Sequence, residues 1–262
     1  MDNNKYALIT GGTSGIGYEL ARLLANDQYN LVIVARNTEE LSRTAQELRQ
    51  QYNIEVLTIS KDLSLRQSPF EVYDEIKSNG IQIDILVNNA AQGQYGEFVN
   101  TEIERELEII QLNISAYVVL TKLFLRDMVT RNKGRILNVA SIAGKLPGPL
   151  QSVYHGTKAF VHSFSESVRA ELKDTDITIT SLLPGATDTD FFHKAQMENS
   201  KILDQGLADP AEVARDGYRA LMEGDDMIVS GAKNKIQVAI GNVTPDRLVA
   251  ETMLKQQGPK EK

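Results

Sequence analysis

Short apolar runs alternate with longer amphipathic segments along most of the chain. The runs are rich in β-branched residues and lack polar alternation, which predicts strands that are largely buried on both faces. Seven such runs are present: Tyr6–Ile9, Leu31–Val34, Glu55–Ile59, Ile83–Val87, Arg135–Val139, Ile177–Leu183 and Met227–Val229.

The segments between these runs have the 3.6-residue period of amphipathic helices. They are Gly15–Asn26, Thr38–Tyr52, Pro69–Asn79, Ile103–Arg131, Ser152–Lys173 and Pro210–Glu223. Local signals support several of these bounds. Asp209 before Pro210 is typical of an N-cap followed by proline at the first helical position, and the Asn79-Gly80 pair is typical of a helix end.

Strands and helices that alternate throughout predict right-handed crossovers and a parallel, doubly wound α/β sheet, that is, a Rossmann fold. Because no linker or repeat interrupts the pattern, we expect residues 1–262 to form a single domain. The ligand crevice of such a sheet lies at the carboxyl ends of its strands. Segment 184–206 has no clear period and is expected to be a substrate loop or lid. The tail, 233–262, contains a predicted helix near Asp246–Gln257 and is expected to cover the active site or to pack on a neighbouring subunit.

The composition excludes several classes of chemistry. The 262 residues include no Cys, which excludes disulfides, thiol nucleophiles and Cys-bound metals, and the three His residues show no metal-ligand spacing, so no metal site is expected. A formal charge of −7 argues against a nucleic-acid or anionic-membrane partner. The chain shows neither a secretory signal pattern nor 18 uninterrupted apolar residues, so a cytoplasmic location without a transmembrane helix is expected.

A glycine-rich turn follows the first predicted strand directly, at 10–17. Its sequence is Thr-Gly-Gly-Thr-Ser-Gly-Ile-Gly. Glycines let the backbone approach a pyrophosphate closely, and the N-terminus of the next helix offers unpaired N–H groups and a partial positive charge. The turn therefore predicts a dinucleotide site, with these residues in contact: Gly11, Thr13, Ser14, Gly15, Ile16 and Gly17.

Arg36 indicates which dinucleotide is preferred. Sites specific for NAD place Asp or Glu at the end of the second strand, where the carboxylate binds the ribose 2′-hydroxyl. Here Ala35 occupies that position and Arg36 follows it. A guanidinium can bind a 2′-phosphate, which a carboxylate would repel. The sequence therefore predicts NADP(H), preferred over NAD(H).

Three further features indicate acid–base chemistry. Tyr154 and Lys158 lie at positions i and i+4 of one predicted helix, so they share a face, and an ammonium beside a phenol is expected to lower the pKa of that phenol. Ser141 follows the fifth strand and is expected near the start of the same helix, where its hydroxyl can hold a substrate carbonyl. Asn113 is a polar amide inside an apolar helix and needs a partner there.

These motifs, in this order, resemble those of the short-chain dehydrogenase/reductase family, in its branch of about 250 residues with a T-G-x-x-x-G-x-G turn. The resemblance extends from about Lys5 to Val229. It rests on the glycine turn, Asp62, the Asn-Asn-Ala-Ala segment at 88–91, Asn113, Ser141, the Tyr-x-x-x-Lys motif at 154–158, and the Pro-Gly pair at 184–185.

The resemblance implies a mechanism and further contacts. Tyr154 is then the residue that protonates a carbonyl oxygen as hydride arrives from the nicotinamide, and Lys158 also binds the nicotinamide ribose. Asn113 is implied to kink its helix and to hold a water in a proton relay. The implied cofactor contacts place Asp62 and Leu63 beside the adenine, Asn88 to Ala91 along the adenosine ribose, and Pro184, Gly185, Thr187 and Thr189 near the nicotinamide or a phosphate. The contacts at 88–91 include Asn89, Ala90 and Ala91, and Ala91 departs from the Gly that is usual in the family.

The substrate stays open at this stage: a small carbonyl or alcohol compound such as a 3-oxoacyl thioester, a 3-hydroxy acid or another ketone. His155 is expected to point away from Tyr154, at a flank or an interface. The resemblance implies a homodimer or homotetramer paired through Ile103–Arg131 and Ser152–Lys173. Two alternatives are a cofactor-binding sensor without catalysis, which the presence of both Tyr154 and Lys158 disfavours, and a sugar-nucleotide epimerase or dehydratase, which usually has a longer C-terminal substrate region.

Overall fold

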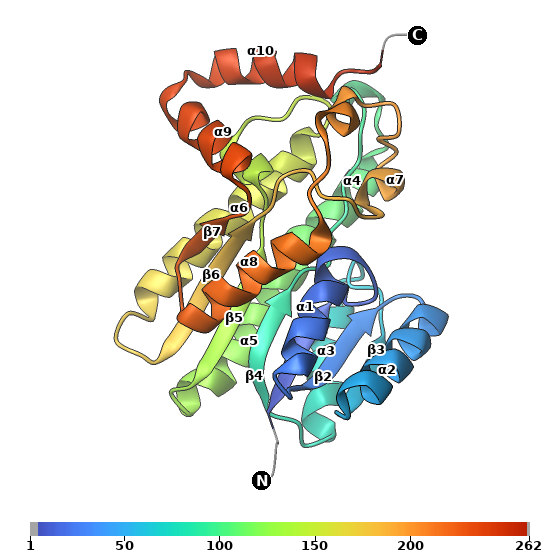
Figure 1. Ribbon diagram of the computed structural model, residues 1–262, viewed down its shortest axis with the longest axis vertical. Coiled ribbons are helices and arrows are strands. Elements are labelled where there is room, and N and C mark those ends of the chain that lie inside the picture. Colours follow the sequence, from blue (N-terminus) through green and yellow to red (C-terminus); the bar gives the residue numbers. More distant parts are fainter. Residues whose placement is uncertain (1–4, 261–262) are drawn as a thin grey trace.

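A parallel sheet forms the centre of the computed structural model, which describes residues 5–260 (Figure 1). Its strand order is β3-β2-β1-β4-β5-β6-β7, so the order reverses between β1 and β4. All six pairings are parallel. The strands are β1 (Tyr6–Thr10), β2 (Asn30–Ala35), β3 (Val56–Ser60), β4 (Ile83–Asn88), β5 (Gly134–Val139), β6 (Ile177–Leu183) and β7 (Met227–Val229).

Helices connect the strands and continue beyond β7. The α-helices are α1 (Gly15–Asn26), α2 (Thr38–Tyr52), α3 (Ser68–Ser78), α4 (Ile103–Ile110), α5 (Ala116–Thr130), α6 (Ser152–Glu171), α7 (Phe191–Lys194), α8 (Pro210–Glu223), α9 (Ala232–Val243) and α10 (Asp246–Gln257). A π-helical turn, Gln111–Ser115, joins α4 to α5. Short 3₁₀ turns are Phe98–Asn100, Ile142–Lys145 and Lys201–Gln205.

Two helical layers cover the sheet. The apolar stripes of α1, α2 and α8 pack on one face, with Leu24 and Leu48 fully buried there. The stripes of α3, α5 and α6 pack on the other, with Phe124 and Met128 at the contact. Sheet residues next to each other in sequence divide between the two faces, as the period of a strand requires. The predicted doubly wound Rossmann fold is therefore confirmed.

The segment predicted as one helix over Ile103–Arg131 is a continuous helical run with the π-turn in its middle. By length and composition it is the one helix in the described part of the chain that could cross a membrane, with 44% of the apolar window buried. Leu120 and Phe124 pack against the sheet, so this helix is a core element of the fold.

Two details differ from the expectations. The edge strands β3 and β7 are only partly buried, and Met227 is 38% exposed. The helix α9 was not predicted, since its apolar residues Ile236 and Ile240 face outward and give no core-facing pattern. The tail helix α10 is present as expected, while residues 1–4 and 261–262 of the predicted domain lie outside the described residues.

Candidate active site

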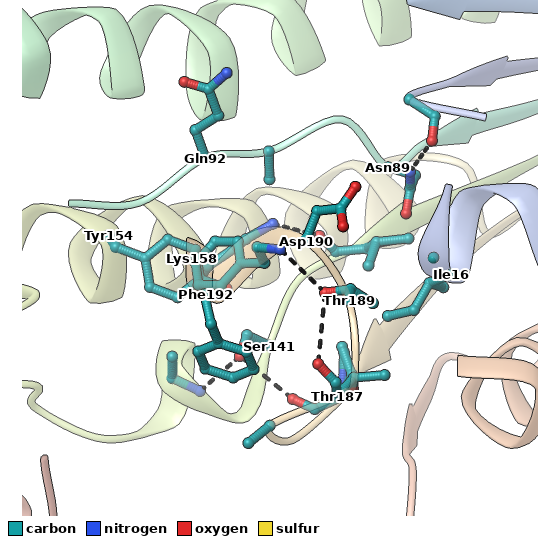
Figure 2. Close-up of a pocket in the computed structure, with 18 of the residues that line it drawn as sticks. Ile16, Asn89, Gln92, Ser141, Tyr154, Lys158, Thr187, Thr189, Asp190 and Phe192 are labelled. Carbon is teal, nitrogen blue, oxygen red and sulfur yellow. Dashed lines mark hydrogen bonds between the residues drawn. The ribbon is translucent and has the colours of Figure 1, made fainter. Parts of the chain in front are cut away.

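A cavity of about 600 Å³ opens at the carboxyl ends of the strands, as predicted for a doubly wound sheet. Its walls are the segments that follow β1, β2, β3, β4, β5 and β6, together with residues of α6 and of the C-terminal helices. Ile16 and Asn89 lie toward one end, and Ser141, Tyr154 and Lys158 toward the other (Figure 2).

The glycines of the turn leave no room for larger residues at their positions. Gly11 and Gly15 have positive φ values of 68° and 54°. A Cβ added to Gly17 would lie 2.2 Å from the Gly11 carbonyl oxygen and 2.3 Å from Asn89 Nδ2. The first turn of α1 has no acidic residue, and the Ser14 side chain does not cap it. The backbone N–H groups at this helix start therefore face the cavity in the manner that a pyrophosphate requires.

Thr10 and Asn89 hold the turn against β4. The Thr10 hydroxyl accepts hydrogen bonds from the backbone N–H groups of Asn89 and Ala90 at 2.9 and 3.1 Å. The Asn89 side-chain amide donates to the carbonyls of Thr10 and Gly11 at 2.9 and 3.0 Å. Asn89 thus shapes the site through the loop, a role that the sequence did not indicate.

Asn88 is a correction. The expectation placed it along the ribose, but its side chain is fully buried between β4 and β5. Its amide donates to Asn138 and to Thr121 at 2.9 and 3.0 Å. Neighbouring residues of a strand point to opposite faces of the sheet. The Asn88 side chain therefore points toward α5, and the residues that follow it, Asn89 to Ala91, line the cavity.

The end of the cavity near the glycine turn carries charged side chains. Arg36 lines it with a side chain that is 53% exposed, and Arg36 Nη1 lies 3.8 Å from Asp62 Oδ2. Glu40, in the first turn of α2, accepts a hydrogen bond from the Thr13 hydroxyl at 3.3 Å and also lines the cavity. The sequence assigned Glu40 to the helix only, so its place in the wall of the site was missed.

Tyr154 and Lys158 lie one turn apart on α6. Lys158 is only 2% exposed, and its Nζ donates to the Val139 carbonyl at 2.7 Å. The same nitrogen lies 5.9 Å from the centre of the Tyr154 ring and 5.6 Å from that of Tyr117. The ammonium group therefore faces two aromatic rings and one backbone carbonyl, and among residues 5–260 no carboxylate forms a hydrogen bond or an ion pair with it.

The predicted direction of the Tyr154 pKa is wrong for this structure. Burial raises the pKa of Tyr154 to about 12, and a hydrogen bond from Ser141 only partly opposes the rise. Burial also lowers the pKa of Lys158 to about 7, so much of its charge is lost near neutral pH. Desolvation of both groups therefore outweighs the attraction between a charged lysine and a phenolate.

Ser141 lies at the end of β5 and helps to hold the site together. Its hydroxyl donates to the Pro184 carbonyl at 3.3 Å and accepts from the Ala143 N–H at 3.1 Å. It thus links the loop after β5 to the loop after β6, next to Tyr154. The expectation that this loop reaches the start of the Tyr154 helix is confirmed.

Asn113 lies behind the cavity wall rather than in it. It is fully buried in the π-turn, where its amide donates to the Gln92 carbonyl at 2.8 Å and to the Thr157 hydroxyl at 3.0 Å. Its Oδ1 accepts from the Gln92 N–H at 3.0 Å. The buried amide therefore has hydrogen-bond partners for both its oxygen and its nitrogen, as expected. The helix is distorted at this position, which was also expected.

The segment 184–206 covers the cavity. A Cβ on Gly15 would lie 2.7 Å from Thr189 Cγ2, so this segment meets the glycine turn directly. Phe191 packs on Tyr154 with ring centres 4.9 Å apart. Thr187 and Thr189 are linked by a hydrogen bond from the Thr189 hydroxyl to the Thr187 carbonyl at 3.4 Å (Figure 2).

The C-terminal segment forms the remaining wall. The helices α9 and α10 lie on the side toward which the strands point (Figure 1), and Asn234, Met253 and Gln257 line the cavity. A Cβ on Gly185 would lie 2.4 Å from Asn234 Nδ2. Of the two predicted locations for the tail, covering the site is therefore the one observed within this chain. No motif marked these residues, so sequence reasoning missed them.

His155 is a second correction. The expectation placed it at a flank or an interface, but it is 5% exposed and lines the cavity. Its Nδ1 lies 2.8 Å from the Leu146 carbonyl and its Nε2 lies 3.2 Å from Gln257 Nε2. Burial lowers its pKa. Its ring makes an edge contact with the Tyr154 ring, with centres 6.1 Å apart, so the expectation that it points away from Tyr154 is also wrong.

The structure brings nearly all predicted site residues to one cavity. Those that line it are Gly11, Thr13, Ser14, Gly15, Ile16, Gly17, Arg36, Asp62, Leu63, Asn89, Ala90, Ala91, Ser141, Tyr154, Lys158, Pro184, Gly185, Thr187 and Thr189. Within the described part of the chain, Asn88 and Asn113 are the predicted residues that do not line the cavity. The assignment of a role to each residue stays a prediction.

Fold and site together define a nucleotide-binding oxidoreductase on a doubly wound parallel sheet. A family model described as short chain dehydrogenase matches residues 5–200, and the chain belongs to the short-chain dehydrogenase/reductase family.

Several known proteins are similar to this chain. The very-long-chain 3-oxoacyl-CoA reductase of Rattus norvegicus is 36% identical over 186 residues, which cover 69% of this chain and 58% of the rat protein. A short-chain dehydrogenase from Sphingobium yanoikuyae in complex with NADPH superposes with a TM-score of 0.81 at 26% identity, covering 92% of this chain and 96% of that one. An alcohol dehydrogenase from Thermococcus sibiricus, complexed with 5-hydroxy-NADP, gives 0.76 at 27% identity, with 86% and 95% covered.

Proposed function

We propose that this protein interconverts a carbonyl compound and an alcohol with NADP(H) as the cofactor, preferred over NAD(H). The observation that carries the proposal is the convergence of Ser141, Tyr154 and Lys158 at one end of a cavity whose other end holds the glycine turn and Arg36. The crowded glycines and the uncapped start of α1 fit a dinucleotide pyrophosphate. When bound, the nicotinamide supplies or accepts the hydride.

Tyr154 is the proton donor in the direction of reduction. With a pKa near 12 its phenol is protonated at neutral pH and can give a proton to a carbonyl oxygen. Lys158 can then return the proton, because its pKa near 7 lets it exist in both forms at working pH. Ser141 is beside Tyr154, and its hydroxyl exchanges the 3.3 Å hydrogen bond to the Pro184 carbonyl for one to the carbonyl oxygen of the substrate. Asn113 positions the backbone of Gln92 and the Thr157 hydroxyl from behind.

Arg36 carries the cofactor preference in this proposal. Its half-exposed guanidinium lies at the adenosine end, 3.8 Å from Asp62, where it can exchange that weak pairing for a 2′-phosphate. Two of the similar solved structures contain NADPH or an NADP derivative, which supports the preference. Glu40 opposes it, because a carboxylate in the same wall repels the phosphate.

The substrate class in the proposal is a 3-oxoacyl compound, a 3-hydroxy acid or another ketone. The curated relatives are named as 3-oxoacyl-CoA reductases, which supports the first of these. This chain spans a little under three fifths of the length of those relatives, so the proposed substrate class is kept broader than their 3-oxoacyl-CoA. The apolar residues Leu146, Phe191 and Met253 in the cavity wall fit a substrate with an apolar part.

Self-association is part of the proposal as well. The side chains of Ile103, Leu107 and Phe160 on the two long helices are between 41% and 58% exposed, so these helices present apolar surface to water. Burying them between two copies would remove this surface from water, and we propose a homodimer or homotetramer. Light scattering of the purified protein tests this, and a monomer at micromolar concentration would contradict it.

The experiment that tests the activity is a substrate panel followed at the nicotinamide absorbance. Ketones, aldehydes, 3-oxoacyl thioesters and 3-hydroxy acids are each offered with NADPH or NADP and, in parallel, with NADH or NAD. We expect turnover of at least one carbonyl compound, with a higher kcat/KM for NADPH than for NADH. Absence of turnover across the panel, in a protein that still binds NADPH, would favour the sensor alternative.

A further inference from the structure

Two unpartnered polar atoms lie in the wall of the cavity. Gln151 Nε2 and Gln257 Oε1 are both buried and find no hydrogen-bond partner among residues 5–260. Their residues are only 5% and 2% exposed, and both line the cavity. A buried amide atom without a hydrogen-bond partner is unfavourable, so such atoms at a ligand site indicate a group that the ligand supplies.

Both glutamines lie near the end of the cavity that holds Tyr154. Gln151 directly precedes α6, and its carbonyl accepts a hydrogen bond from the His155 N–H at 3.0 Å, one turn from Tyr154. A Cβ on Gly93 would lie 2.8 Å from Phe191 and 3.4 Å from Gln151 Nε2, which places the Gln151 amide beside the ring that packs on Tyr154. Gln257 reaches the same region from the end of α10, through its contact with His155.

His155 determines which way the Gln257 amide is turned. The Leu146 carbonyl can only accept, so His155 Nδ1, 2.8 Å away, carries a proton. Burial favours the neutral ring, and its Nε2 is then an acceptor. The Gln257 NH₂ group donates to it at 3.2 Å, which turns the Gln257 carbonyl oxygen away from His155. The subsite therefore offers one acceptor, Gln257 Oε1, and one donor, Gln151 Nε2.

The backbone of Gln257 is held separately from its side chain. Its carbonyl accepts hydrogen bonds from the Tyr95 hydroxyl at 2.6 Å and from the Ser200 hydroxyl at 2.9 Å. Tyr95 precedes α4 and Ser200 belongs to the segment that covers the cavity. Since the tail is tied down through its backbone, the side-chain amide is free to recognise a ligand.

We propose that Gln151 and Gln257 form a second polar subsite, which binds a secondary amide on a thioester substrate while Tyr154 acts on the 3-oxo group, and that His155 is the positioning residue for Gln257. A trans amide carries its carbonyl and its N–H on opposite edges, so two side chains from different segments of the chain can satisfy both. A carboxylate has no donor for Gln257 Oε1, so the subsite selects against free 3-hydroxy acids. The inference rests on the proposed function and narrows its substrate class.

The test compares two thioesters of acetoacetate that share the reacting carbonyl. The N-acetylcysteamine thioester carries a secondary amide in its arm, and the S-pentyl thioester lacks it. NADPH oxidation gives kcat/KM for each substrate, and the ratio of the two values is the readout. A general loss of folding or of catalytic power lowers both values together and leaves the ratio unmoved.

The wild-type protein is expected to prefer the amide-bearing thioester. Gln257→Leu and Gln151→Leu should each reduce the preference about tenfold or more, the loss that accompanies removal of one buried hydrogen bond. His155→Phe should reduce it as well, because the Gln257 amide loses its orientation. Gln51→Leu, at an exposed position in the last turn of α2 and outside the cavity lining, is the matched control and should leave the ratio unchanged.

The outcomes separate the two proposals. A wild-type protein that reduces both thioesters equally, or glutamine variants with an unchanged ratio, would overturn the subsite and leave the reductase function standing. A preference for a hydroxyl-bearing arm over the amide arm would overturn the assignment of an amide. Absence of turnover with these thioesters and with simple ketones alike would overturn the proposed function itself. Gln151→Leu and Gln257→Leu are independent variants. If one of them does not fold, the ratio measured for the other still tests the subsite.

Discussion

The Nζ atom of Lys158 lies 5.9 Å from the centre of the Tyr154 ring and 2.7 Å from the Val139 carbonyl oxygen. The lysine is therefore held by the backbone at the end of β5, beside the phenol rather than in a hydrogen bond with it. Burial brings the pKa of Lys158 down to about 7 and raises that of Tyr154 to about 12. These two shifts set the protonation state from which catalysis must start, and they lead to separate predictions.

Tyr154→Phe should reduce kcat/KM for carbonyl reduction by about 10²–10⁴, because the variant loses the proton donor and keeps the ring. The Kd for NADPH, measured by fluorescence titration, should change by less than a factor of a few. Tyr73→Phe is the control, since Tyr73 binds Asp127 on α5, away from the cavity, and should retain full activity. Turnover retained in Tyr154→Phe would exclude the phenol as the acid.

The buried Lys158 should make the free energy of unfolding depend on pH. Between pH 7 and 10.5 the unfolded chain still holds the proton on this lysine, whereas the folded protein has released it. The unfolded state thus binds more protons, and raising the pH stabilises the folded state by about 1.4 kcal/mol per pH unit for one group. The stabilisation is greatest above pH 10.5 and is lost as the pH falls toward 7.

The measurement is urea unfolding of wild type and of Lys158→Met from pH 7.5 to 9.5. The difference in free energy of unfolding should move in favour of the wild type as the pH rises. Lys122→Met, on the exposed side of α5, is the control and should run parallel to the wild type. Parallel curves for Lys158→Met would show that Lys158 keeps its proton in the folded state.

Charge at the adenosine end should tune the choice of cofactor. Arg36→Asp is expected to weaken NADPH binding about 10- to 100-fold more than NADH binding, because a charge-assisted contact to the 2′-phosphate is lost. Glu40→Gln should tighten NADPH binding severalfold, since it removes a repelling carboxylate. Arg43→Asp, further along α2 and outside the cavity lining, is the matched control. Equal losses for both cofactors in Arg36→Asp would show that Arg36 does not contact the phosphate.

Gly17→Ala and Gly156→Ala should have opposite consequences. A methyl at 17 meets the Gly11 carbonyl oxygen and Asn89, so the turn must shift, with a loss of about 1–3 kcal/mol in stability and of dinucleotide binding. A methyl at 156 meets nothing within 4 Å on α6, and alanine should stabilise that helix by about 0.5–1 kcal/mol. Thermal unfolding with and without NADPH measures both effects. A Gly17→Ala protein that retains its cofactor-induced shift in Tm would refute the close-approach argument.

The local pattern of the chain was enough to predict the sheet, the helical layers and the cofactor end of the site. Strand and helix periods are properties of neighbouring residues, and the glycine turn at 10–17 needs little beyond its own backbone to approach a phosphate. The Tyr154 and Lys158 spacing is likewise a property of one helix. For these reasons the motifs, read in order, also indicated the family.

Tertiary structure decided what the sequence left open. His155 and Gln257 meet across 102 positions, and no local pattern links a helix interior to the end of the chain. The pKa of Tyr154 rises where spacing alone predicted a fall, because desolvation depends on everything packed around the ring. The chain by itself therefore determined which residues gather at the carboxyl ends of the strands, whereas packing between distant segments determined the pKa shifts of these residues and the shape of the cavity wall.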